Sequence, residues 1–163
     1  MSGSILDVCC GGRMFWFDKE NPNVVFGDIR DGSYQMKDGD KMRTLDVHPD
    51  IIMDFRDIPF ADGWFNLVVF DPPHMKRLGE NSWMAKKYGK LSENWQEDIK
   101  KGFAECFRVL KVGGVLIFKW NEYDIPLREI LALTPHKPLF GDPSGKMQKT
   151  HWVCFVKFEE NGE

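Results

Sequence analysis

Short runs of apolar residues, each about the length of one β-strand, recur along this chain and alternate with segments of helical or loop character. The runs lie at residues 5–8, 24–29, 51–55, 67–70, 115–120 and 152–158. This alternation is typical of a parallel sheet whose strands are joined by crossover connections. The run from Leu67 to Phe70 reads LVVF without a polar break, which predicts a central strand covered on both faces. The pattern therefore predicts an α/β fold with a doubly wound, mostly parallel sheet.

Two segments of the chain are predicted to be helices. The first spans Asn94 to Leu110. Its apolar residues recur at helical spacing and share one face, namely Ile99, Phe103, Cys106, Phe107 and Leu110. A shorter helix is predicted at residues 126–133, and a turn rich in glycine, proline and serine around residues 141–145 leads into the last apolar run.

The length of 163 residues fits a single domain over residues 1–163, with no separate target-recognition domain. No apolar run approaches the roughly 18 residues that a membrane span needs, and the start lacks the pattern of a signal peptide. The four cysteines form no CxxC pair and have no histidine at zinc spacing, which favours a reducing compartment and no metal site. We therefore expect a cytoplasmic protein that does not associate with membranes.

Small and acidic residues follow the first three apolar runs. The first run leads into a turn that contains Asp7, Cys9, Cys10, Gly11 and Gly12. Its glycines let the backbone turn tightly and approach a ligand at the carboxyl edge of a sheet. Asp28 ends the second run 21 residues after Asp7, close to the spacing at which a carboxylate reaches ribose hydroxyls, although an exposed turn aspartate is the plain alternative. Asp54 and Phe55 end the third run.

The fourth apolar run is followed directly by Asp71, Pro72, Pro73 and His74. The two prolines remove two backbone donors and hold the chain extended, while their carbonyl oxygens still accept hydrogen bonds. Together with the Asp71 carboxylate, such a turn is suited to bind an amine through its N–H groups.

A basic segment at residues 74–91 comes next and is the predicted substrate loop. Its basic and aromatic residues are Lys76, Arg77, Trp83, Lys86, Lys87, Tyr88 and Lys90, and Glu80 is its one acid. The net charge of the whole chain is −3, so this segment is a local exception. Cations for phosphates beside rings for unstacked bases predict a nucleic-acid interface, and a solvated loop with two docked rings is the alternative.

The motifs DVCCGG, GDIR, DFRDIPF, NLVVFDPPH and LKVGGVLIFKW, in this order, resemble the class I S-adenosylmethionine-dependent methyltransferases. DPPH is similar to the (D/N/S)PP(Y/F/W) motif of the branch that methylates amines, and the resemblance covers residues 4 to 158. It implies a single-domain Rossmann-like sheet with a C-terminal antiparallel strand, and S-adenosyl-L-methionine as the cofactor.

The resemblance also implies roles for residues at the ends of the strands. Asp7 and Gly11 are expected to surround the methionine moiety of the cofactor, Asp28 to hold its ribose, and Asp54 with the Phe55 backbone to bind its adenine. Further cofactor contacts are expected from Cys9, Cys10, Gly12, Ile29 and Asp71. Asp71 and the Pro72 carbonyl are expected to hold the target amine, with Pro73 and His74 completing the catalytic turn.

The chain departs from the family pattern at two points. Only four residues precede Ile5, where the family usually has a helix that covers the cofactor, so the pocket is expected to be open or closed by a second copy or a partner subunit. His74 stands where an aromatic ring more often stacks on the flipped base, and its imidazole is planar but smaller.

The function expected from these features is methyl transfer to the exocyclic amine of a nucleic-acid base, with adenine in DNA favoured over RNA. Methylation of a protein glutamine amide uses a similar acceptor turn and remains an alternative. A cofactor-binding regulator without turnover is the alternative that is not an enzyme.

Overall fold

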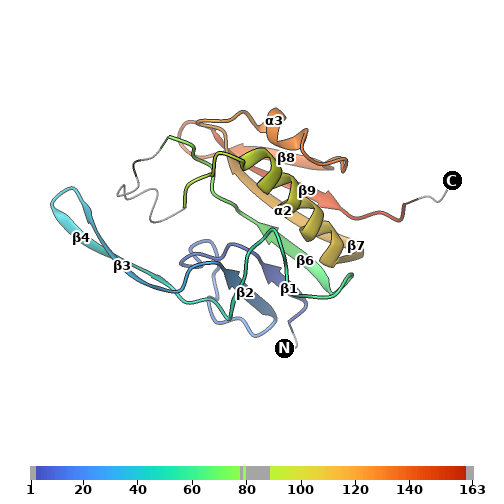
Figure 1. Cartoon of the computed structure of the whole chain (residues 1–163), viewed down its shortest axis with the longest axis horizontal. Helices are drawn as coiled ribbons and strands as arrows, with labels where there is room; N and C mark the ends of the chain where they lie inside the picture. Colours follow the sequence, from blue (N-terminus) through green and yellow to red (C-terminus); the bar gives the residue numbers. More distant parts are fainter. Residues whose placement is uncertain (1–2, 78, 80–88, 161–163) are drawn as a thin grey trace.

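The computed structural model of the chain describes residues 3–77, 79 and 89–160. At its centre is a seven-stranded sheet with the strand order β5-β2-β1-β6-β7-β9-β8 (Figure 1). These strands are β1 (Ile5–Asp7), β2 (Val24–Asp28), β5 (Ile51–Ile52), β6 (Phe65–Phe70), β7 (Leu110–Asn121), β8 (Phe140–Ser144) and β9 (Thr150–Val156). Strand β9 runs antiparallel to both of its neighbours, and the pairs on the other side of β7 are parallel. The predicted α/β fold with a C-terminal antiparallel strand is confirmed.

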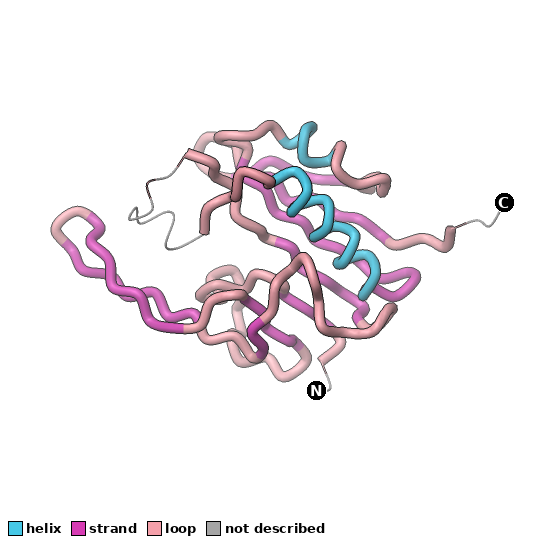
Figure 2. The backbone as a smooth tube through the Cα atoms, in the orientation of Figure 1, coloured by secondary structure: helices cyan, strands magenta, loops and turns pink. Residues whose placement is uncertain are grey.

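Helices α2 (Trp95–Val109) and α3 (Leu127–Leu131) lie on the same face of the sheet (Figure 2). The predicted apolar face of α2 is buried, with Ile99 and Cys106 fully inaccessible, and packs on β6 and β7. On the facing side of β7, Leu116, Phe118 and Trp120 are also fully buried. The largest side chains of the core therefore lie between the sheet and α2.

The segment between β2 and β5 forms a two-stranded antiparallel hairpin, β3 (Gly32–Asp38) and β4 (Lys41–Val47), which projects away from the sheet (Figure 1). The sequence analysis assigned no strand to residues 32–47. Most of these residues are polar and exposed, so their apolar pattern is too weak to indicate a strand. The side chains of Leu45 and Val47 are buried and form a small core with Tyr34.

Boundaries elsewhere also differ from the prediction. The turn expected around residues 141–145 is largely strand β8, an edge strand that pairs with β9 alone. Pro143 lies in this strand, where the missing N–H group can face away from the ladder, which is why sheets accept proline at their edges. Strand β5 covers only Ile51–Ile52 rather than residues 51–55.

Neighbouring β1 and β6 lie at the centre of the sheet, where the chain changes the direction in which it adds strands. In open α/β sheets, the carboxyl edge beside such a switch point is where ligands bind. All four cysteines are free, and no helix among the described residues has the length and apolar character needed to cross a membrane.

Candidate cofactor and substrate site

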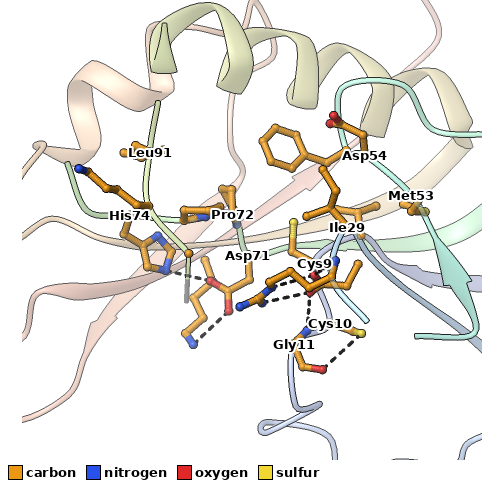
Figure 3. A pocket seen from close by; sticks show the side chains of 18 of the residues that line it. Cys9, Cys10, Gly11, Ile29, Met53, Asp54, Asp71, Pro72, His74 and Leu91 are labelled. Carbon is orange, nitrogen blue, oxygen red and sulfur yellow. Dashed lines mark hydrogen bonds and ion pairs between the residues drawn. The ribbon is translucent and has the colours of Figure 1, made fainter. Parts of the chain in front are cut away.

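A cavity of about 440 Å³ opens at the carboxyl ends of the central strands (Figure 3). Its volume is in the range of small-molecule and cofactor sites. Most of the residues predicted to bind the cofactor or the target amine line it: Cys9, Cys10, Gly11, Gly12, Asp28, Ile29, Asp54, Phe55, Asp71, Pro72, Pro73 and His74. Residues far apart in sequence thus meet in one site, as their positions after successive strands predict.

Asp7 is not among the residues that line this cavity. The residue is fully buried, and its carboxylate accepts hydrogen bonds from Trp16 Nε1 at 2.7 Å and from the Cys9 N–H at 3.2 Å. Burial raises the pKa of Asp7 to about 7, partly offset by the hydrogen bond from Trp16. Asp7 therefore anchors the turn that follows β1.

The turn after β1 is tied to the end of β2 through Asp28. Gly11 adopts a φ of 50°, and its N–H donates to Asp28 Oδ2 at 2.9 Å. The backbone N–H of Arg30 donates to Asp28 Oδ1 at 2.9 Å, and its Nε donates to the same oxygen at 3.0 Å. Asp28 is only 3% exposed, so its carboxylate is held in one orientation at the cavity wall.

Asp54, which also lines the cavity, forms a second carboxylate–guanidinium pair. Arg56 Nη2 lies 2.6 Å from Asp54 Oδ2, and Arg56 also reaches Asp98 of α2 at 3.1 Å. The hydrogen bonds from Arg56 lower the pKa of Asp54. Phe55 packs against Phe70 with ring centroids 5.3 Å apart, so the backbone beside Asp54 is fixed to the core.

The Asp71 carboxylate lies between two basic side chains. Its Oδ1 is 2.9 Å from His74 Nε2, and its Oδ2 is 3.4 Å from Lys119 Nζ. His74 is 9% exposed and meets the Trp120 ring edge-on, with centroids 4.9 Å apart. His74 also lines the cavity, with its imidazole beside Asp71.

Lys119 was not predicted as a site residue, although it lines the cavity. The signal that could have identified it is the alternation of β7, in which Phe118 and Trp120 are buried under the helices and Lys119 projects from the other face. Trp120 is fully buried, and its Nε1 donates to the Ile125 carbonyl at 2.9 Å.

The structure describes part of the predicted nucleic-acid loop. The backbone N–H groups of Lys76 and Arg77 donate to Asp124 Oδ2 at 2.8 and 3.2 Å, and Lys76 Nζ lies 5.2 Å from the centroid of a Trp95 ring. Lys90 lines the cavity. The predicted contacts Trp83, Lys86, Lys87 and Tyr88 lie outside the described residues.

The electrostatic character of the site is set by carboxylates that surround the turn after β1. Burial raises the pKa of the Cys9 thiol well above its usual range, and Asp28, Asp7 and Asp71 add to this effect. The thiol is therefore protonated at neutral pH and is not a nucleophile.

No protein-family model and no curated protein sequence matches the chain. Among solved structures, the PH0226 protein from Pyrococcus horikoshii matches with a TM-score of 0.60 and 14% identity, over 96% of this chain and 82% of that one. A SAM-dependent methyltransferase from Methanosarcina mazei matches with a TM-score of 0.56 and 12% identity, over 98% and 95% of the two chains. A chain of the complex between the Haloferax volcanii Trm112 methyltransferase activator and the putative methyltransferase matches with a TM-score of 0.51 and 12% identity, over 97% of this chain and 84% of that one. The chain therefore has the fold of S-adenosylmethionine (SAM)-dependent methyltransferases.

Proposed function

We propose that this protein is a SAM-dependent methyltransferase that modifies the exocyclic amine of a nucleic-acid base, with adenine in DNA favoured. The observation that carries the proposal is the convergence of three carboxylates on one cavity. Asp28, Asp54 and Asp71 lie at or just after the ends of three different strands of the sheet, and all three line this cavity. The fold, which is that of SAM-dependent methyltransferases, supports the same assignment.

The residues present fit a nucleoside cofactor with a positive charge. Asp28 would hold the ribose, Asp54 and the Phe55 backbone the adenine, and the turn at Cys9, Cys10, Gly11 and Gly12 the methionine moiety, with Ile29 on the wall beside them. The Asp28 and Asp71 carboxylates line the cavity beside this turn, where they can face a sulfonium cation. When bound, the cofactor supplies an activated methyl group.

Asp71 and the Pro72 carbonyl would hold the target amine. The lone pair of an aromatic amine is delocalised into its ring, which makes the nitrogen a poor nucleophile. Acceptors that hold both N–H groups favour a pyramidal nitrogen and stabilise the positive charge that grows on it. His74, whose Nε2 lies 2.9 Å from Asp71 Oδ1, positions this carboxylate, and Pro73 keeps the turn extended.

A nucleic-acid substrate is proposed because of the basic segment beside this turn. A target base in a duplex must first leave its stack, and cations near the site can hold the phosphates of the extruded strand. We also propose that a second copy or a partner subunit covers the open side of the cavity. One of the structures with this fold is a complex with a methyltransferase activator.

The test is methyl transfer from SAM with a labelled methyl group to separate pools of DNA, RNA and protein. The proposal predicts label in DNA. Label in RNA alone would support methylation of a base amine with RNA rather than DNA as the substrate. Label found only in protein would overturn the nucleic-acid assignment in favour of a glutamine amide. Cofactor binding without label in any pool would support the regulator.

A further inference from the structure

Lys119 places an ammonium group directly beside the proposed amine-binding carboxylate. It projects from β7 on the face opposite the helices, next to Trp152 of β9, its partner in the strand register. Its Nζ lies 3.4 Å from Asp71 Oδ2, and its side chain is 22% exposed. Because both residues line the cavity, any ligand that contacts Asp71 also meets this ammonium.

Two aromatic rings hold the ammonium at this position. Lys119 Nζ lies 5.4 Å from the centroid of the Phe15 ring and 5.3 Å from that of the Trp152 ring. The two rings meet edge-to-face, with centroids 5.4 Å apart and an interplanar angle of 90°. Distances below about 6 Å are those of cation–π attraction, which strengthens where water is excluded. The ammonium is therefore a fixed feature of the site rather than a mobile surface charge.

Lys119 retains capacity to donate to a ligand. An ammonium has three N–H donors, and Asp71 is the one hydrogen-bond acceptor for Lys119 among residues 3–77, 79 and 89–160. The Asp71 carboxylate likewise has about four lone-pair sites, so Oδ2 can accept from a ligand amine while it remains paired with Lys119. A donor and an acceptor thus stand side by side, 3.4 Å apart, at the cavity wall.

This arrangement is complementary to an amine and a ring nitrogen that are bonded to the same carbon. We propose that Lys119 donates a hydrogen bond to that ring nitrogen while Asp71 accepts one from the amine, so that the pair selects this edge of the base. In adenine the edge consists of N6 and N1. The inference rests on the proposed function and adds to it a residue that determines specificity.

The proposed contact acts on recognition more than on chemistry. A cation that donates to the ring nitrogen draws electrons from the ring and does not make the amine more nucleophilic. Its stabilisation is therefore present in the bound substrate as well as in the transition state, which changes KM more than kcat. If Lys119 only neutralised Asp71, the KM of the substrate would not depend on the presence of the ring nitrogen.

The test combines substitution of Lys119 with deletion of one atom from the substrate. The substrates are single-stranded DNA oligonucleotides with one target adenine, 1-deazaadenine or, as a control for the other side of the ring, 7-deazaadenine. With the unsubstituted protein, removal of N1 should lower kcat/KM about 10- to 100-fold beyond the intrinsic change in amine reactivity, as expected for a hydrogen bond to a charged group. In Lys119→Met, removal of N1 should lower kcat/KM by no more than about twofold beyond the intrinsic change in amine reactivity.

Matched variants separate recognition from general effects. Lys119→Arg keeps charge and donors and should preserve part of the N1 penalty, whereas Lys111→Met, at the exposed opposite end of β7, should preserve all of it. If Lys119→Met does not fold, Lys119→Gln, which loses the charge and keeps a polar side chain, replaces it and should show a reduced penalty. The ratio of kcat/KM for 7-deazaadenine to kcat/KM for adenine should be the same in all variants.

The outcomes distinguish this inference from the proposed function. Transfer to adenine with an N1 penalty that persists unchanged in Lys119→Met and Lys119→Gln would overturn the role of Lys119 and leave the proposed function standing. Absence of transfer to any nucleic acid by the unsubstituted protein would overturn the proposed function, and the role of Lys119 with it.

Discussion

At the scale of single residues, the three carboxylates on the cavity wall share one feature, since each faces a cation of the same chain. The closest N···O distances are 3.0 Å for Asp28 with Arg30, 2.6 Å for Asp54 with Arg56 and 3.4 Å for Asp71 with Lys119. A ligand must therefore share or displace an existing partner. The Asp71 pair is the longest of the three, and an incoming amine can enter it with the smallest loss of attraction.

Asp28 provides a residue-scale prediction for cofactor binding. Asp28→Asn keeps the shape of the side chain and removes its charge, so hydrogen bonds from ribose hydroxyls should lose roughly 1.5 to 3 kcal/mol. SAM affinity measured by calorimetry should fall about 10- to 100-fold. Asp31→Asn, which changes an exposed carboxylate nearby, is the control and should bind normally. Unchanged affinity in Asp28→Asn would remove this residue from the cofactor site.

Asp7 gives a second prediction at this scale, for the pH dependence of stability. Because burial raises its folded pKa to about 7 from the unfolded value of 3.8, the folded state holds a proton between these values that the unfolded state has lost. The free energy of unfolding should therefore fall as the pH rises from about 4 to about 7, by at most about 4 kcal/mol, and then level off. Urea unfolding across this range should show a flatter profile for Asp7→Asn. Identical profiles for the two proteins would contradict the raised pKa.

At the scale of elements, apolar patterns predicted the parts of the fold that are buried. The helix at Trp95–Val109 and the strand at Phe65–Phe70 both bury long apolar surfaces, and both were predicted to within about two residues of these bounds. The hairpin at residues 32–47 and the edge strand β8 are held by backbone pairing between mostly exposed residues, which leaves little trace in the sequence. Site residues on strand ends were predicted for the same reason that the strands were. Lys119 was not assigned to the site, although the alternation of β7 carried a signal for it.

Helix α2 carries a prediction that links packing to the site. A Cβ atom at Gly102 would lie 2.6 Å from Phe70 Cζ and 2.7 Å from Phe55 Cδ2. Gly102→Ala should lower the free energy of unfolding by about 1 to 2 kcal/mol, because overpacking outweighs the gain in helix propensity. Lys101→Ala, on the exposed face of the helix, should change it by less than about 0.5 kcal/mol. An equal or greater stability of Gly102→Ala in urea unfolding would contradict the tight packing of α2 on the cavity wall.

At the scale of the whole molecule, one sheet brings the proposed cofactor and amine sites to a single edge. The turn after β1, the ends of β2 and β6, and Lys119 near the end of β7 belong to adjacent strands, so their spacing is fixed by the pairing of the sheet. Both helices lie on the other side of β7 from Lys119. The scaffold is rigid where the chemistry is proposed, which suits a reaction that depends on the alignment of two ligands.

The most direct test of this account is the identity of the methylated product and its dependence on Asp71. DNA that has been incubated with the protein and SAM is digested to nucleosides and examined by mass spectrometry, in parallel with the variant Asp71→Ala, which removes the acceptor. The account predicts N6-methyladenine with the unsubstituted protein and at least a 100-fold lower yield with Asp71→Ala, while calorimetry shows that this variant still binds SAM. Near-normal methylation by Asp71→Ala would contradict the amine-binding role of this carboxylate.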